Sequence, residues 1–156
     1  WAAEFRSIVK QSDPEMLLGL YHCPWNDVEF DSARIRILGL DYDLLKGVVD
    51  VFSPMVYHGR MGREPEWVAE NISWTSERLN IQNGMYPKVW PIVQAHDDPG
   101  TISGVEFETV LKGGLAGKSS GVMMFTTNAM AGSEEKTEVM KKLYLELSSL
   151  FTLFNS

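Results

Sequence analysis

Polar and aromatic side chains gather where four apolar runs of the sequence end. They are His22 and Trp25 after the first run, Tyr57, His58 and Arg60 after the second, Gln94, His96 and Asp97 after the third, and Phe125 at the end of the fourth. All three histidines of the chain are in this set. Imidazole, phenol, guanidinium and amide groups can hydrogen-bond the hydroxyls of a polar ligand, and aromatic rings offer it flat apolar faces. If the four run ends meet at one sheet edge, this set would line a cleft for a ligand such as a carbohydrate.

The four apolar runs predict four β-strands, near residues 16–23, 49–58, 88–96 and 120–127. Their starts are separated by intervals close to the roughly 30 residues of a βα unit. The runs are nearly continuous rather than alternating, which is typical of parallel strands buried on both faces. We therefore expect a parallel sheet with the candidate residues at the carboxyl ends of its strands.

Helical patterns separate the predicted strands. Residues 65–79 begin with a proline suited to a first helical position and carry apolar side chains every three or four positions. Three further helices are expected from their N-terminal signals. Ser103 caps the first of them and has a glutamate, Glu106, at the spacing of a capping box. Ser133 caps the last helix, and Asp41 or Asp43 caps a short one.

The predicted elements are one helix followed by four βα units, and we expect them to form a single domain over residues 1–156. This order predicts an α/β fold that is half of a (β/α)8 TIM barrel. A sheet that stops at four strands leaves two unpaired edges. We therefore expect either the C-terminal half of a longer protein or a half-barrel completed by a partner, such as a second copy of the chain. A flavodoxin-like open sheet is the alternative architecture.

Composition excludes several classes of protein. A net charge of −7 without a Lys/Arg cluster argues against a nucleic-acid partner. No apolar run approaches the roughly 20 residues that cross a bilayer, so no membrane span is expected. The single cysteine, Cys23, forbids an internal disulfide and leaves the compartment open, so a secreted or periplasmic full-length protein is compatible with it. No cofactor is expected.

The stretches VDVFSPMVYH and SGVMMFTTNAM resemble strands of glycoside-hydrolase-like TIM barrels, the broad set that includes chitinase-like and uncharacterised bacterial glycosidase domains. The resemblance covers roughly residues 16–130 and corresponds to the C-terminal half of such a barrel. It implies that the four runs are strands five to eight. It also implies that the acidic motif of the fourth strand, which carries the proton donor, would precede Trp1.

The resemblance covers two positions of the candidate site. In chitinase-like barrels the sixth strand commonly contains Met-x-Tyr-Asp, and Met55-Val56-Tyr57 matches it with His58 in place of the aspartate. The eighth strand there commonly ends near a tryptophan, where this chain has Phe125. The resemblance therefore implies that Tyr57 helps to hold the reacting sugar.

The leading hypothesis is a glycoside hydrolase that acts on oligo- or polysaccharides and takes its proton donor from the N-terminal half. Asp97 would be the second carboxylate, although HDDPG is also an ordinary turn composition. The catalytic side chains are then Tyr57, His58 and Asp97, and the substrate-binding side chains are His22, Trp25, Arg60, Gln94, His96 and Phe125.

Three alternatives remain open. The chain could be a non-catalytic carbohydrate-binding barrel. Tyr57 and His58 could serve only structural hydrogen bonds at the sheet edge. A metal-dependent TIM-barrel hydrolase would use His22, His58 and His96 as zinc ligands, although the sequence lacks any His-x-His or His-Glu-x-x-His pair, so no metal site is assigned.

Overall fold

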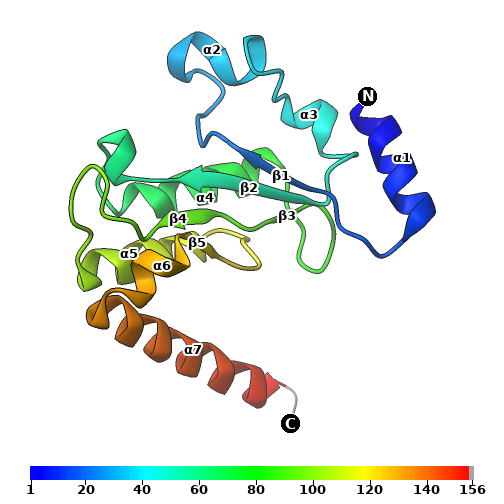
Figure 1. The fold of residues 1–156 in the computed structure, drawn as a ribbon. Helices are drawn as coiled ribbons and strands as arrows, with labels where there is room; N and C mark the ends of the chain where they lie inside the picture. The colour runs from blue at the N-terminus through cyan, green and yellow to red at the C-terminus, as the bar shows by residue number, and fades with distance from the viewer. Residues whose placement is uncertain (155–156) are drawn as a thin grey trace.

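The computed structural model describes residues 1–154, with side chains through residue 148 (Figure 1). The helices are α1 (Ala2–Ser12), α2 (Glu29–Arg36), α3 (Tyr42–Leu45), the 3-10 turn η1 (Gly59–Met61), α4 (Trp67–Arg78), α5 (Gly104–Gly114), α6 (Thr127–Ala131) and α7 (Glu134–Phe154). The strands are β1 (Gly19–His22), β2 (Val51–Val56), β3 (Lys88–Val89), β4 (Ile92–Gln94) and β5 (Met123–Phe125). None of the helices within residues 1–154 is both long and apolar enough to cross a membrane.

The strands form a parallel sheet in the order β1-β2-β4-β5, with β3 paired to β2 ahead of β4. The predicted α/β class and the parallel sheet are therefore confirmed. Because the spatial order follows the chain order, the sheet has no reversal of strand order of the kind that defines a flavodoxin-like fold. Sequential parallel strands are the arrangement of a partial α/β barrel.

Each predicted strand forms, but each is shorter than its apolar run. The third run is interrupted at Pro91, which has no N–H to give to a neighbour. Its two halves, β3 and β4, pair with successive parts of β2. The fourth run yields only Met123–Phe125, because Thr126 caps α6 by accepting from Ala129 N at 3.2 Å.

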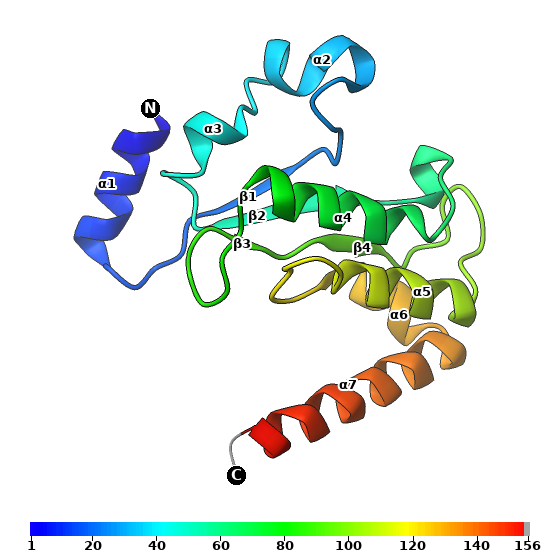
Figure 2. The same cartoon turned by 180° about the vertical axis from the view of Figure 1, so that it is seen from behind.

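One face of the sheet is covered by α4 and α5, which also pack against each other (Figure 2). Val56, Val93 and Met124 occupy one row of the sheet register on this face. The predicted stripe of α4 packs against this core, and its residues Val68, Ile72, Thr75 and Leu79 are all buried. Burial of an aliphatic side chain such as Val68 or Ile72 contributes roughly 1.5–3 kcal/mol, so this interface holds the helices in place.

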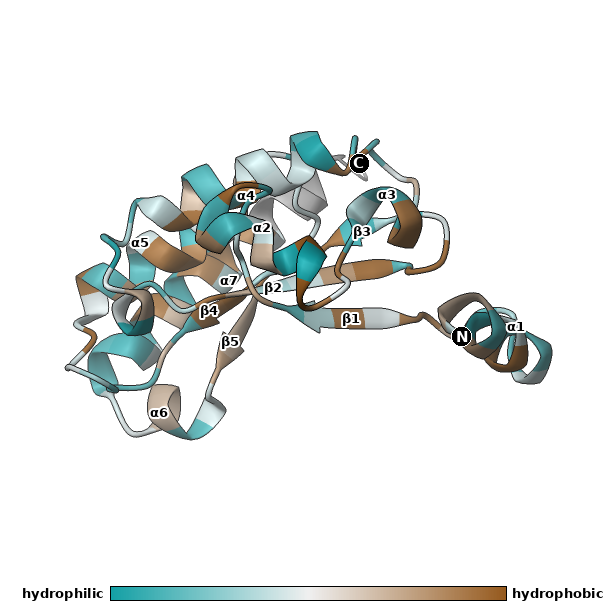
Figure 3. Ribbon diagram, turned by 90° about the horizontal axis from the view of Figure 1, so that it is seen from above, coloured by the Kyte–Doolittle hydropathy of each residue, from teal (hydrophilic) through white to brown (hydrophobic). Residues whose placement is uncertain are grey.

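The opposite face of the sheet is not covered by a helix layer within the part of the chain that the structure describes (Figure 3). Tyr21 on β1 is 67% exposed, and Met123 on β5 is partly exposed. Strands β2 and β4 have the burial on both faces that the apolar runs predict. The prediction of burial on both faces is therefore wrong for β1 and β5 in this chain, because helices pack on one side only.

Most of the predicted caps form. The side chain of Asp41 accepts from Asp43 N at 2.9 Å at the start of α3, and Ser133 accepts from Lys136 N at 3.3 Å at the start of α7. Ser103 accepts from Glu106 N at 3.2 Å at the start of α5. These bonds satisfy N–H groups that have no partner inside a helix. They fix the points at which α5 and α7 leave the carboxyl edge of the sheet.

Candidate functional site

Three of the predicted site residues form an aromatic cluster at the carboxyl edge of the sheet. Tyr57 and Phe125 stack with ring centroids 5.6 Å apart and an interplanar angle of 25°. His96 meets both rings edge-on, at 5.6 Å from Tyr57 and 5.4 Å from Phe125. The three residues follow or end neighbouring parallel strands, which is why residues so far apart in sequence meet. This set, Tyr57, His96 and Phe125, is called the aromatic cluster below.

The aromatic cluster is partly open to solvent. Phe125 is 45% exposed, whereas Tyr57 and His96 are half-buried. Burial raises the pKa of Tyr57, and the nearby Arg60 partly opposes this effect, so the phenol stays protonated and can donate a hydrogen bond at neutral pH. His96 donates from Nδ1 to the carbonyl of Phe125 at 3.0 Å, and its Nε2 is buried without a hydrogen-bond partner among the described residues.

Gln94 ties together the loops that carry the cluster. Its side chain is fully buried and donates from Nε2 to the carbonyls of His96 at 3.1 Å and Asp98 at 2.9 Å. Its Oε1 accepts from the backbone N–H of Arg60 at 3.2 Å. A Cβ on Gly59 would lie 3.2 Å from this amide, so glycine permits the close approach. Gln94 therefore positions the loops and is not placed to contact a ligand.

His58 points away from the aromatic cluster toward α5. Its ring is buried, and Nε2 donates to Oε1 of Glu106 at 2.8 Å. The sequence predicts a capping box, in which the carboxylate of Glu106 returns to the backbone of Ser103. The serine half of that box forms, but the carboxylate binds His58 instead. The position of Glu106 at the start of a helix, beside a strand end, was the signal that could have found this pair.

Asp97 is engaged by a buried lysine. Its Oδ1 accepts from Nζ of Lys136 at 2.8 Å and from the backbone N–H of Ile102 at 2.8 Å. Lys136 is almost completely buried and also donates to the carbonyl of Ala95 at 2.8 Å. The bond from Lys136 and that from Ile102 hold the pKa of Asp97 below its usual value. Asp97 is therefore ionised at neutral pH and is unsuited to proton donation.

His22 lies in the hydrophobic core rather than at the cluster. Its ring packs edge-on against Tyr42 and Phe52, and Nδ1 donates to the carbonyl of Cys23 at 2.7 Å. Burial lowers the pKa of His22 to about 4, so the ring is neutral at pH 7. His22 is the last residue of β1 and points to the face that the helices cover. It therefore does not lie at the open edge, where the sequence predicts it to bind the substrate.

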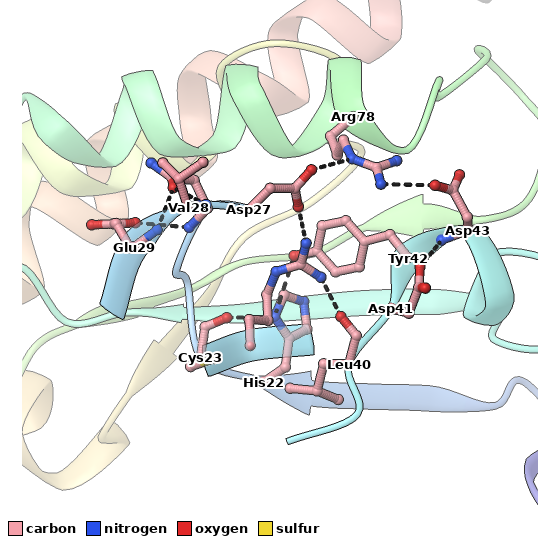
Figure 4. A network of polar contacts seen from close by, with 12 residues as sticks. His22, Cys23, Asp27, Val28, Glu29, Leu40, Asp41, Tyr42, Asp43 and Arg78 are labelled. Carbon is pink, nitrogen blue, oxygen red and sulfur yellow. Dashed lines mark hydrogen bonds and ion pairs between the residues drawn. The ribbon is translucent and has the colours of Figure 1, made fainter. Parts of the chain in front are cut away.

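An ion-pair network closes over His22 and Tyr42 (Figure 4). Arg34 is fully buried, pairs with Asp27 and lies 3.9 Å from the centre of the Tyr42 ring. Arg78 of α4 binds Asp27 at 2.7 Å and Asp43 at 2.8 Å. The network connects α2, α3 and α4, so it holds the segment after β1 against the body of the protein.

The three histidines do not converge. His22 lies in the core, His58 binds Glu106, and His96 belongs to the aromatic cluster. Among the residues described by the structure, no group of three or more His, Cys, Asp or Glu side chains could hold a metal ion. The geometry therefore does not provide the ligand set that the metal-dependent alternative requires.

Trp25 and Arg60 lie together in a second hollow at the same edge. A cavity of about 340 Å³ is lined by Trp25, Glu29, Phe30, Arg60, Met61, Arg63 and Trp67. The first three residues come from the segment after β1, and the others from the segment between β2 and the first turn of α4. This cavity is called the loop pocket below.

Comparison of the chain with models of known protein families and with curated proteins found no match to either.

Proposed function

We propose that this chain forms one side of the carbohydrate cleft of a glycoside-hydrolase-like α/β barrel, in which its strands would be strands five to eight. The observation that carries the proposal is the aromatic cluster at the carboxyl edge of a sequential parallel sheet. Ligands of α/β barrels bind at this edge. An exposed ring beside a phenol and an imidazole suits a sugar, which has apolar ring faces and hydroxyls around its rim.

The residues of the aromatic cluster and those that support it would have different roles in binding. Phe125, the most exposed ring, would stack against a sugar face. The hydroxyl of Tyr57 would donate to a sugar oxygen, and Gln94 would hold both loops in place without touching the substrate. His58 would act indirectly, because its bond to Glu106 fixes the backbone that presents Tyr57.

Hydrolysis needs a proton donor and, in most such enzymes, a second carboxylate. An ionised Asp97 is compatible with the second role and not with the first. The donor would therefore come from the N-terminal half-barrel, whether that half belongs to a longer chain or to a partner. A half-barrel of this kind would also cover the open face that carries Tyr21 and Met123.

A non-catalytic carbohydrate-binding barrel is the second candidate. It is favoured by the bonds that Asp97 makes to Lys136 and Ile102, since both use the same carboxylate oxygen and tie the residue into the fold. Release of reducing ends by the protein with its N-terminal half present would support the enzyme. Tight binding without turnover would support the binder.

The test of the proposal is a calorimetric titration of the chain with chitohexaose, cellohexaose and xylohexaose. At least one of them should bind, and Phe125→Ala and Tyr57→Ala should each weaken that binding by about tenfold, because each removes a ring contact. Tyr144→Ala is the matched control, since Tyr144 is an exposed aromatic residue of α7. Equal affinity in folded Tyr57→Ala, Phe125→Ala and Tyr144→Ala proteins would refute the proposal.

A further inference from the structure

The loop pocket has the size and composition of a sugar subsite. Its volume of about 340 Å³ lies at the lower end of the range for small-ligand sites. Trp25 and Phe30 form one wall, with ring centroids 4.7 Å apart and an interplanar angle of 52°. Phe30 is 64% exposed, and Trp67 lines the pocket from the start of α4. Exposed aromatic rings around a hollow offer stacking surface for a pyranose ring.

The charges in the loop pocket favour an anion. Arg60 and Arg63 both line it, although the chain as a whole carries a net charge of −7. Glu29 is the acidic lining residue, and both of its oxygens are engaged, Oε1 by Arg63 at 2.9 Å and Oε2 by the backbone N–H of Asn26 at 2.7 Å. Its charge is therefore largely balanced by Arg63, which also lies 5.9 Å from the Trp67 ring.

Arg60 is the cation that remains available for a ligand. Its side chain is 54% exposed and faces Asp98 at 3.7 Å, a separation too long for a strong hydrogen bond. An exposed ion pair of this kind contributes little stability. A ligand carboxylate could replace Asp98 and form the shorter bidentate contact that a guanidinium favours.

The loop pocket adjoins the aromatic cluster through one short segment. Arg60 follows Tyr57 by three residues, and its backbone N–H binds Gln94, whose amide also binds the carbonyl of His96. A ligand that spans several sugar units could therefore contact both places. The two sites differ in character, because arginines line the pocket and the cluster consists of two aromatic rings and an imidazole.

We propose that the loop pocket binds an acidic sugar unit, a hexuronate, of the same oligosaccharide that contacts the aromatic cluster. Trp25 and Phe30 stack on the ring, and Arg60 pairs with the carboxylate. This inference rests on the proposed carbohydrate function and adds the substrate class. A polysaccharide that contains uronic acids is then the substrate.

The experiment compares hexagalacturonate and hexamannuronate with the neutral cellohexaose and xylohexaose in titrations of the intact chain. A hexuronate should bind at least tenfold more tightly than the neutral hexamers, and higher salt should reduce this preference. Arg60→Gln should remove about tenfold of hexuronate affinity and weaken the binding of the neutral hexamers much less, because only the hexuronates lose a charge pair. Arg36→Gln is the control, because Arg36 is an exposed arginine that pairs with Asp31 on α2, outside the pocket.

The possible outcomes separate this inference from the proposed function. Tighter hexuronate binding that depends on Arg60 supports the pocket assignment. Tyr57-dependent binding without preference for hexuronates overturns the pocket assignment and leaves the proposed function standing. Hexuronate binding that Arg60→Gln leaves unchanged also overturns it. Absence of binding to these four hexamers overturns the pocket assignment, and absence of binding to chitohexaose as well overturns both proposals.

Discussion

Nε2 of His58 donates to Oε1 of Glu106 across 2.8 Å, which connects the end of β2 to the first turn of α5. The pair joins segments that are 48 residues apart, and the histidine side chain is 1% exposed. Tyr57 and His58 therefore have opposite environments although they are adjacent. Tyr57 belongs to the partly exposed aromatic cluster, and the buried His58 connects the same loop to α5.

The first prediction concerns this pair. Glu106→Ala should lower the free energy of unfolding by about 1–3 kcal/mol, because a buried donor on His58 loses its acceptor. Glu106→Gln should cost less, since its amide oxygen can still accept. Denaturant unfolding of the two variants measures the difference. Glu138→Ala, which removes an exposed pair with Lys141, should change stability by less than about 1 kcal/mol. Equal stability of Glu106→Ala and Glu138→Ala would show that the pair is not structural.

The second prediction concerns the titration of His22. Burial lowers its pKa to about 4 in the folded protein, against about 6.5 in an unfolded chain. Between these values the unfolded state binds the proton first, so stability decreases as pH falls from 6.5 to 4. The full effect amounts to roughly 3 kcal/mol.

Two measurements check this prediction. NMR titration should show one histidine ring, absent from the spectrum of His22→Gln, that protonates only near pH 4. The unfolding free energy of His22→Gln should also vary less between pH 6.5 and 4 than that of the parent protein. A ring of His22 that protonates above pH 6 would contradict its placement between Tyr42 and Phe52.

The sequence predicts the sheet and the aromatic cluster well, for one physical reason. Apolar runs identify the parallel strands, and neighbouring parallel strands end at the same edge, so Tyr57, His96 and Phe125 had to lie close together. The same reasoning fails for His22 and His58. Side chains alternate between the faces of a strand, and the sequence does not say which face the helices cover.

The remaining features of the site depend on contacts between distant segments. The carboxylate of Glu106 binds His58 rather than the backbone of Ser103, and predicting this requires the position of α5 relative to His58. The loop pocket arises because two connecting segments meet, and their conformations are set by Gln94 and by the Asp27 network. Local patterns mark the helix start at Glu106 and the strand end at His58, but they do not define the contacts between distant segments.

The third prediction concerns the bond between Lys136 and Asp97. Lys136→Met keeps most of the side-chain volume but removes the bonds to Asp97 and Ala95, and it should cost about 1–3 kcal/mol at pH 7. The pKa of Asp97 is lowered in the folded state, so its stabilising effect is complete above about pH 4 and disappears as pH falls through the folded pKa. The stability difference between the two proteins should therefore shrink below pH 4.

NMR titration of Asp97 in two variants tests the role of Lys136. NMR titration of the Asp97 carboxyl group should give a higher pKa in Lys136→Met than in the parent protein, since the largest cause of the lowered value is gone. Lys141→Met, which affects an exposed lysine of the same helix, should leave that pKa unchanged. An unaltered Asp97 pKa in Lys136→Met would exclude the lysine as its cause.

The fourth prediction concerns the attachment of α1. Asp50 is buried, binds Arg6 at 2.7 Å and Lys10 at 3.3 Å, and accepts from Leu18 N at 2.9 Å. Burial opposes its ionisation, but the bonds from Leu18, Arg6 and Lys10 prevail and lower its pKa. Asp50→Asn removes the charge that holds both cations.

We expect the amides of α1 in Asp50→Asn to exchange with deuterium at least tenfold faster than in the parent protein, while those of α4 and α5 keep their protection. The reason is that both cations that bind Asp50 lie on α1, whereas α4 and α5 are held by the hydrophobic core. Asp31→Asn is the matched control, because Asp31 pairs with Arg36 at the surface, away from α1. Unchanged exchange in α1 of Asp50→Asn would mean that the ion pairs of Arg6 and Lys10 with Asp50 do not hold the helix.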